Sequence, residues 1–171
     1  MSVSQAVKAE CLQMIEILLG KQVKLRVVQR PSITIITDAS LSGYGGVLIS
    51  ANTFSTYAGC WALQYHINIL EMFAVEKMLK RFARRHNSIS ILSDNTTVIN
   101  ILRRGHSSTA VLNNAVIRIY QWVLERDISF QISYVPKWMN PADAMSRGLP
   151  SSSWPQAAHG LLEEFAVGLV E

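Results

Sequence analysis

The fold is indicated most directly by residues 32–50, SITIITDASLSGYGGVLIS. The β-branched residues from Ile33 to Thr37 predict a strand that stops at Asp38, and a Ser/Gly turn then leads into a second strand, 44–49. Another turn at Ala51-Asn52 precedes a third expected strand, 54–63. Three strands joined by short connections predict an antiparallel meander.

The remaining elements follow from hydrophobic periodicity and from helix start and stop signals. The expected order is a long helix at 68–85, a buried strand at 88–93, a short helix ending at Arg104, a helix at 109–126, a strand at 128–135, and a final helix with Asn140 as N-cap and Pro141 as first residue. Crossings from strand to helix to strand imply parallel pairing beside the meander. The fold class is therefore α/β, with a mixed sheet and helices on its faces.

The chain of 171 residues has the length of one domain, and its 49% hydrophobic and 16% charged residues exclude disordered and collagen-like classes. We expect three parts. Residues 1–31 form an N-terminal helix and connecting segment, residues 32–148 form the domain, and residues 149–171 form a C-terminal tail whose apolar residues either cover the core or meet a partner.

The charge of the chain points to a polyanionic partner and away from membranes. The formal net charge is +4 and the pI about 9.3. Residues 39–70 lack charged side chains but are rich in Ser, Thr, Asn, Gln and Gly, so no membrane span is expected. Two isolated cysteines and the lack of a visible secretory signal predict an intracellular protein, cytoplasmic or nuclear.

Four acidic residues stand at the ends or beginnings of expected elements: Asp38, Glu71, Asp94 and Asp143. Each also has a purely structural interpretation. Asp38 could be a turn residue, Glu71 could complete a capping box with Asn68, Asp94 could cap the following helix, and Asp143 could complement a helix dipole.

Taken together, the four positions favour a metal site. If the strands that end near Asp38 and Asp94 are parallel neighbours, both carboxylates emerge at the same edge of the sheet. Glu71 shares a helix stripe with Val75 and Met78 and therefore faces the core. A cluster of carboxylates persists only with a compensating cation or proton, and an all-oxygen ligand set suits Mg²⁺ or Mn²⁺.

Four local motifs carry a family resemblance: Thr37-Asp38-Ala39-Ser40 with Gly43-Tyr44-Gly45, then His66-Ile67-Asn68-Ile69-Leu70-Glu71, then Ser93-Asp94-Asn95-Thr96, then Asn140-Pro141-Ala142-Asp143-Ala144-Met145-Ser146-Arg147. Over residues 32–148 they make the chain resemble the ribonuclease H domain of retroelement reverse transcriptases. The resemblance is nearest to the gypsy-like and DIRS-type branches.

The resemblance implies an RNase H-like fold with a five-stranded mixed sheet in the order 3-2-1-4-5. It also implies an endonuclease that cleaves the RNA strand of RNA/DNA hybrids with two Mg²⁺ ions, for which Mn²⁺ can substitute. Asp38 would bridge both ions, Glu71 and Asp94 would complete one site, and Asp143 would hold the other. Its partners would be the hybrid and an upstream polymerase domain, with no small-molecule cofactor.

Substrate contacts are expected from polar groups near the acids. Ser40, the turn of Gly43 and Gly45, and Asn95 could recognise ribose 2′-hydroxyl groups, and Trp138 could stack on nucleic acid. The loop before Asp143 lacks the histidine of cellular ribonucleases H, so Tyr134 or Lys137 is the candidate replacement. The basic helix face from Lys77 to Arg85 is either a phosphate-binding surface or merely solvated.

Two other functions stay open at this stage. A catalytically silent RNase H-like scaffold that binds nucleic acid or a protein is the main alternative, although such a copy would be free to lose any of the four acids. An integrase or resolvase of the same superfold is disfavoured, because the order Asp, Glu, Asp, Asp on these elements follows that of ribonuclease H.

Overall fold

The computed structural model describes residues 8, 31–50, 53–85 and 87–167. The helix expected at 5–19 and most of the connecting segment 1–31 lie outside the described residues. No helix in the described part of the chain is long and apolar enough to span a membrane.

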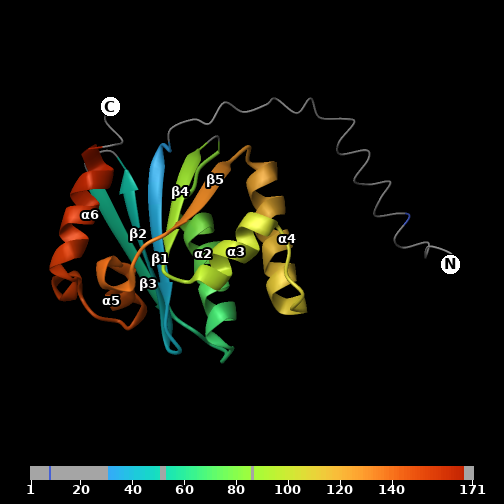
Figure 1. Ribbon diagram of the computed structural model, residues 1–171, viewed down its shortest axis with the longest axis horizontal. Coiled ribbons are helices and arrows are strands. Elements are labelled where there is room, and N and C mark those ends of the chain that lie inside the picture. The colour runs from blue at the N-terminus through green and yellow to red at the C-terminus, as the bar shows by residue number, and fades with distance from the viewer. Residues whose placement is uncertain (1–7, 9–30, 51–52, 86, 168–171) are drawn as a thin grey trace.

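One five-stranded sheet forms the centre of the molecule (Figure 1). The strands β1 (Ile33–Ala39), β2 (Gly43–Ser50) and β3 (Thr53–Cys60) form an antiparallel meander. On the other side of β1, β4 (Ser88–Ser93) and β5 (Ser129–Tyr134) run parallel to it. The order β3-β2-β1-β4-β5 confirms the predicted mixed sheet.

Helices cover both faces of the sheet (Figure 1). On one face lie α2 (Ile67–Phe82), α3 (Thr96–Arg104) and α4 (Ala110–Glu125). On the other lie the short α5 (Ala142–Ser146) and α6 (Gln156–Val167), which follow β5 in the chain. The sheet is thus the middle of three layers, and β1 is buried along its whole length.

The two faces of the sheet bury separate hydrophobic clusters, because successive side chains of a strand point to opposite faces. Ile35 of β1 belongs to the cluster under α2, α3 and α4, whereas its neighbour Ile36 belongs to the cluster under α5 and α6. Trp154, Ala158, Leu161 and Leu162 complete the second cluster, so this part of the predicted tail covers the core.

Several element boundaries differ from the sequence prediction by a few residues. Helix α2 begins at Ile67, and its N-cap is His66, whose Nδ1 accepts a hydrogen bond from the amide of Asn68 at 3.3 Å. The expected capping box of Asn68 is therefore wrong. Helix α5 begins at Ala142 rather than Pro141, although the Asn140 side chain does accept a bond from the Ala142 amide at 3.0 Å.

Strand β3 lies at the edge of the sheet, and most of its residues are exposed. It ends at Cys60, earlier than the predicted Leu63, and it contains no charged residue and no proline.

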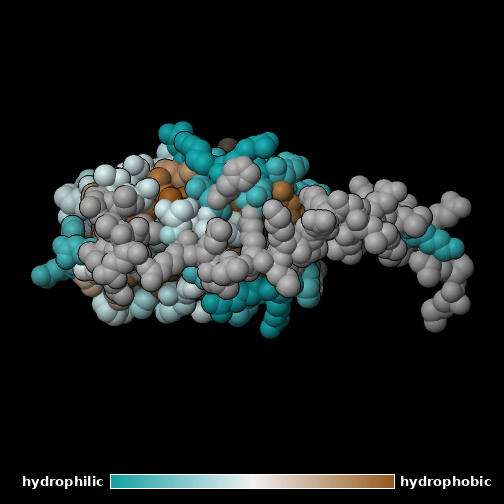
Figure 2. Space-filling view, turned by 90° about the horizontal axis from the view of Figure 1, so that it is seen from above, coloured by the Kyte–Doolittle hydropathy of each residue, from teal (hydrophilic) through white to brown (hydrophobic). Residues whose placement is uncertain are grey.

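Hydrophilic residues gather in separate groups along two opposite edges of the body, with paler and apolar atoms exposed between them (Figure 2).

Candidate metal centre at the edge of the sheet

Three of the four predicted acids meet at one edge of the sheet. Asp38 lies near the end of β1, and Asp94 directly follows the parallel strand β4. Glu71 reaches them from the second turn of α2. One carboxylate oxygen from each residue lies within 4.8 Å of the other two. Parallel pairing brings the two strand ends together, as the sequence predicted.

Two of these carboxyl groups are buried, and burial raises the pKa of both. Asp38 is 4% exposed and Glu71 is 5% exposed. Burial, with a smaller contribution from the charges of Asp94 and Asp143, raises the pKa of Asp38 from 3.8 to about 7. Burial, followed by the charges of Asp38 and Asp94, raises the pKa of Glu71 from 4.5 to about 9.

The cluster suits a hard divalent cation. Two carboxylates about 5 Å apart repel each other by about 3 kcal/mol at an effective dielectric constant of about 20. Within the described chain, the Oε2 atom of Glu71 is buried and accepts no hydrogen bond. A buried oxygen without a partner, beside two further carboxylates, is the donor set that Mg²⁺ and Mn²⁺ prefer.

The structural interpretations of Glu71 and Asp94 as helix caps are wrong. Glu71 lies beyond the first turn of α2, which His66 caps. Asn95 caps α3, since its Oδ1 accepts a hydrogen bond from the Val98 amide at 3.1 Å. Asp94 is therefore not needed for capping, and its Oδ1 instead lies 3.4 Å from the donating amide nitrogen of Asn140.

The fourth acid, Asp143, lies in the first turn of α5 but outside the group of three. Its Oδ1 accepts a hydrogen bond from Arg147 Nη2 at 2.9 Å and lies 3.5 Å from Lys137 Nζ. Its charge contributes to the raised pKa of Asp38, so it belongs to the same electrostatic environment. The side chains of Arg147 and Lys137 thus hold the carboxylate that the family resemblance assigns to a second metal ion.

No family model matches the chain, and no curated protein matches it. Solved structures do. RNase H1 from the halophilic archaeon Halobacterium salinarum aligns with a TM-score of 0.53 at 20% identity, over 66% of this chain and 92% of that one. The chain has the ribonuclease H fold.

Further structures with this fold align over similar lengths. LC11-RNase H1, solved in complex with an RNA/DNA hybrid, gives a TM-score of 0.55 at 15% identity, over 71% of this chain and 98% of that one. The RNase H domain of PFV gives 0.51 at 11% identity, over 74% and 96%. At such identities the likeness is one of fold, so function has to be argued from the residues of this chain.

Two of the predicted substrate-binding residues, Ser40 and Asn95, adjoin Asp38 and Asp94 in the chain and have hydrogen bonds within the fold. Ser40 Oγ donates to the carbonyl of Ser146 at 2.7 Å, which ties the end of β1 to α5. Asn95 Nδ2 donates to Asn68 Oδ1 at 3.0 Å, which ties the start of α3 to α2. Tyr134 and Trp138 are 54% and 64% exposed and free to meet a ligand.

Gly43 and Gly45 allow α5 to lie directly against β2. A Cβ atom on Gly45 would stand 2.5 Å from the Cβ of Met145, and one on Gly43 would stand 2.9 Å from the Ser146 carbonyl oxygen. Real Cβ atoms essentially never approach so closely. These two glycines therefore allow α5 to pack where it does, and α5 in turn carries Asp143.

Sequence reasoning missed Asn140 and Arg147 as parts of the site. Asn140 is fully buried, and its amide nitrogen donates to the Thr37 carbonyl at 3.3 Å as well as to Asp94. It thereby connects the loop before α5 to the ends of both central strands. Its capping role was visible in the sequence, but these contacts span 103 and 46 residues and leave no local signal.

Proposed function

We propose that this chain is a metal-dependent endoribonuclease that cleaves the RNA strand of RNA/DNA hybrids. The observation that carries the proposal is the meeting of Asp38, Glu71 and Asp94, with ligand atoms within 4.8 Å of one another, at one edge of a ribonuclease H fold. The neighbour LC11-RNase H1, solved with an RNA/DNA hybrid, supports the choice of substrate.

The acidic residues and their hydrogen-bond partners have different proposed roles. Asp38, Glu71 and Asp94 would hold one divalent ion, and Asp38 with Asp143 would hold a second. When bound, a pair of such ions supplies an activated water, neutralises the scissile phosphate and stabilises the leaving oxygen. Asn140 would orient Asp94 through its amide, and Arg147 and Lys137 would hold the carboxylate of Asp143 in place.

Substrate selection would come from exposed polar and aromatic groups beside the acids. Ser40 directly follows β1 and Asn95 directly follows Asp94, and these two are the proposed contacts to ribose 2′-hydroxyls, which distinguish RNA from DNA. Gly43 and Gly45 are buried against α5 and would act on the substrate only by positioning that helix. Lys137 is the better replacement for the missing loop histidine, because its ammonium group lies 3.5 Å from Asp143, whereas Tyr134 stands exposed at the end of β5.

We further propose that the chain belongs to a retroelement reverse transcriptase of the gypsy-like or DIRS-type branch. In this view residues 32–148 are the catalytic unit, residues 1–31 connect it to an upstream polymerase domain, and residues 149–171 are a C-terminal extension. An intracellular location agrees with the exposed free thiol of Cys60, which a reducing compartment would preserve.

The decisive experiment uses a hybrid whose RNA strand is end-labelled, incubated with the full chain and Mg²⁺. We expect internal cleavage of the RNA strand, no cleavage of duplex DNA or single-stranded RNA, and no cleavage in EDTA. Asp94→Asn should abolish cleavage, whereas Glu125→Gln, which changes an acid outside the cluster, should leave it unchanged.

Two results would contradict the proposal. If Asp94→Asn cleaves as fast as the unaltered chain, the activity does not come from this site. If the unaltered chain binds the hybrid equally well with and without EDTA but never cuts it, the chain is the silent scaffold that the sequence left open.

A further inference from the structure

We propose that the outer face of α2 is a second binding surface for nucleic acid, one that takes the phosphate backbone away from the metal centre. We call it the α2 cationic face and define it by Lys77, Lys80, Arg81 and Arg118. The inference deepens the proposed function, on which it rests for the choice of ligand.

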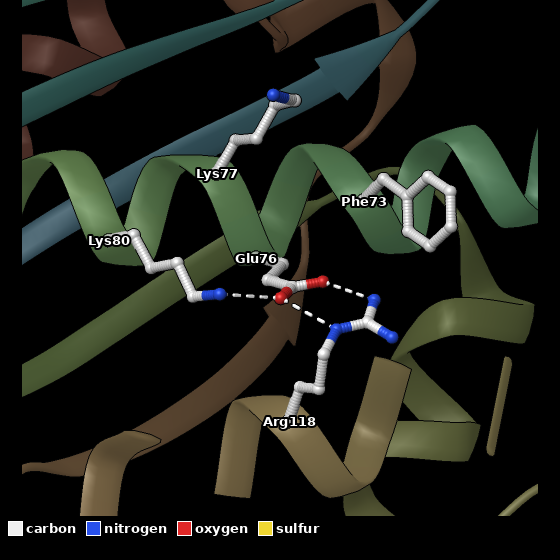
Figure 3. Close-up of a pocket in the computed structure, with 5 residues that line it drawn as sticks. All are labelled: Phe73, Glu76, Lys77, Lys80 and Arg118. Atoms are coloured by element: carbon white, nitrogen blue, oxygen red, sulfur yellow. Dashed lines mark hydrogen bonds and ion pairs between the residues drawn. The ribbon is translucent and has the colours of Figure 1, made fainter. Parts of the chain in front are cut away.

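The side of this face toward α4 is organised around a buried carboxylate (Figure 3). Glu76 is 8% exposed. Its oxygens accept hydrogen bonds from Arg118 Nε and Nη2 at 3.0 and 2.7 Å and from Lys80 Nζ at 2.7 Å. The remaining guanidinium nitrogen of Arg118 points away from Glu76 (Figure 3). One acid therefore fixes two cations whose side chains are still 45–46% exposed.

The side toward the sheet is organised by aromatic rings. Lys77 Nζ lies 5.0 Å from the centroid of the Tyr44 ring, and the guanidinium carbon of Arg81 lies 4.9 Å from that of Tyr57. Cations over ring faces are held without being neutralised, since the attraction comes from the ring quadrupole and not from an opposite charge. Lys77 leaves α2 on the side opposite to Lys80 (Figure 3).

An open pocket of about 280 Å³ lies on this face and is lined by Phe73, Glu76, Lys77, Lys80 and Arg118. Three of its lining residues are cationic and one is anionic, so the pocket keeps a net charge of about +2. The sequence of α2 contains no acid besides Glu71 and Glu76, and both are buried. An anion that approaches this face therefore meets no exposed carboxylate of α2.

A nucleic-acid backbone fits this arrangement better than an acidic protein segment. Three of the four cations come from α2, and Arg118 joins them from α4. Lys77 and Arg81 lie six and ten residues after Glu71, which is about 9 and 15 Å along the axis of α2. A regular row of phosphates can meet such a row of cations one after another, and arginine with lysine is the usual combination at phosphates. The face is also distinct from the metal centre, because Glu71 points into the core while these side chains point outward.

The test measures how salt weakens binding of the hybrid. Fluorescence anisotropy would follow a labelled hybrid in EDTA with the full chain, between about 50 and 300 mM KCl. The slope of log K against log salt is negative, and each lost phosphate contact reduces its magnitude by about 0.9, the value for a B-form duplex. We expect Lys77→Ala and Arg81→Ala each to reduce the magnitude of the slope by about that amount, and the double variant by about twice as much.

A matched control separates local contacts from net charge. Arg126 also stacks on a ring, with its guanidinium carbon 4.6 Å from the Trp122 centroid, but it lies at the end of α4 away from this face. Arg126→Ala removes the same charge and should leave the slope unchanged. Equal slopes for Arg81→Ala and Arg126→Ala would overturn the inference.

Two further outcomes distinguish binding of nucleic acid at this face from binding of an acidic protein, and from the proposed ribonuclease activity. If polyglutamate binds the unaltered chain but not the double variant, while the slope for the hybrid stays the same, the face takes an acidic protein and the inference is wrong. If the unaltered chain never cuts the hybrid but the slopes change as expected, the inference stands and the proposed ribonuclease activity falls.

Discussion

At the scale of single residues, the carboxyl groups of Asp38 and Glu71 govern the chemistry of the metal-free protein. Both are buried, and both have a pKa far above the ordinary value, so at neutral pH the folded chain retains protons that the unfolded chain releases. When both groups ionise, two negative charges lie close together and away from water. The free energy that this costs lowers the free energy of unfolding.

We predict that the metal-free protein loses stability as the pH rises from about 5 to about 9. Its folded state binds more protons than the unfolded state over this window, because the pKa values are raised to about 7 and about 9. One pKa unit corresponds to about 1.4 kcal/mol, or about 3–6 °C in a chain of this size, so thermal unfolding in EDTA should show a fall of several degrees.

Glu71→Gln should remove much of this dependence, since a neutral amide has no proton to lose. The matched control is Glu125→Gln, because the Glu125 side chain is 70% exposed and pairs only with Arg126 among the contacts described. A pH profile of Glu71→Gln that is as steep as that of the unaltered chain would show that burial of Glu71 is not the cause.

The sequence allowed the acids to be chosen, but it did not reveal how Asp143 is held. Asp38 and Asp94 follow β-rich stretches whose parallel pairing could be inferred, and Glu71 shares a stripe with buried residues, so their meeting was predictable. Pairing of Asp143 with Lys137 depends on the path of the loop before α5, and such a path has no periodic signal.

At the scale of elements, the order and type of every described strand and of the predicted helices followed from hydrophobic periodicity. Boundaries were less certain, because tertiary contacts decide them. His66, rather than Asn68, caps α2, because its ring nitrogen Nδ1 accepts a hydrogen bond from the Asn68 amide. The sequence left open whether the apolar residues of the tail cover the core or meet a partner, and the structure places Leu161 in one buried cluster with Ile36 and Val47.

We predict that Gly45→Ala destabilises the protein and disturbs the metal centre together. The added Cβ would collide with Met145 and with the backbone of Ser146, and overpacking of this kind costs about 1–3 kcal/mol. The displaced helix is α5, which carries Asp143. Thermal unfolding should therefore show a lower midpoint, and calorimetric titration with Mn²⁺ should show weaker binding.

Gly160→Ala is the control for this change. Gly160 lies exposed inside α6, and a Cβ there would meet nothing within 4 Å, so the substitution should raise stability by up to about 1 kcal/mol through helix propensity. Should Gly45→Ala unfold at the same temperature as the unaltered chain, close packing of α5 on β2 would not be the reason for glycine at this position.

At the scale of the whole molecule, α6 is part of the body and closes one face of the sheet. Trp154, Ala158, Leu161 and Leu162 are buried against residues of β1 and β2. Burying each of the larger side chains contributes about 1.5–3 kcal/mol, and their sum is comparable with the entire stability of an ordinary domain.

We predict that a chain ending at residue 148 does not fold cooperatively, because Ile36, Val47 and Ile49 lose their cover. Circular dichroism during heating should show a broad transition or none. Point variants give a milder version of the same test: Leu161→Ala should lower the unfolding midpoint by several degrees, whereas Leu149→Ala, at a side chain 46% exposed, should not. An unchanged midpoint for the shortened chain would mean that residues 32–148 suffice.

The central pairing of the sheet also determines when the site can exist. Strand β1 pairs with β4 in a register that joins Ile33 to Ile89, so the two strands are separated by most of the meander and all of α2. Closing so long a loop is entropically expensive, and contacts of this range slow folding. The meander can form as a nascent chain emerges, but Asp38 has no carboxylate partner from β4 until Asp94 has been synthesised and the crossover has closed. The group of three carboxylates therefore cannot assemble before the β1–β4 crossover closes, and metal binding by this group reports on that step of folding.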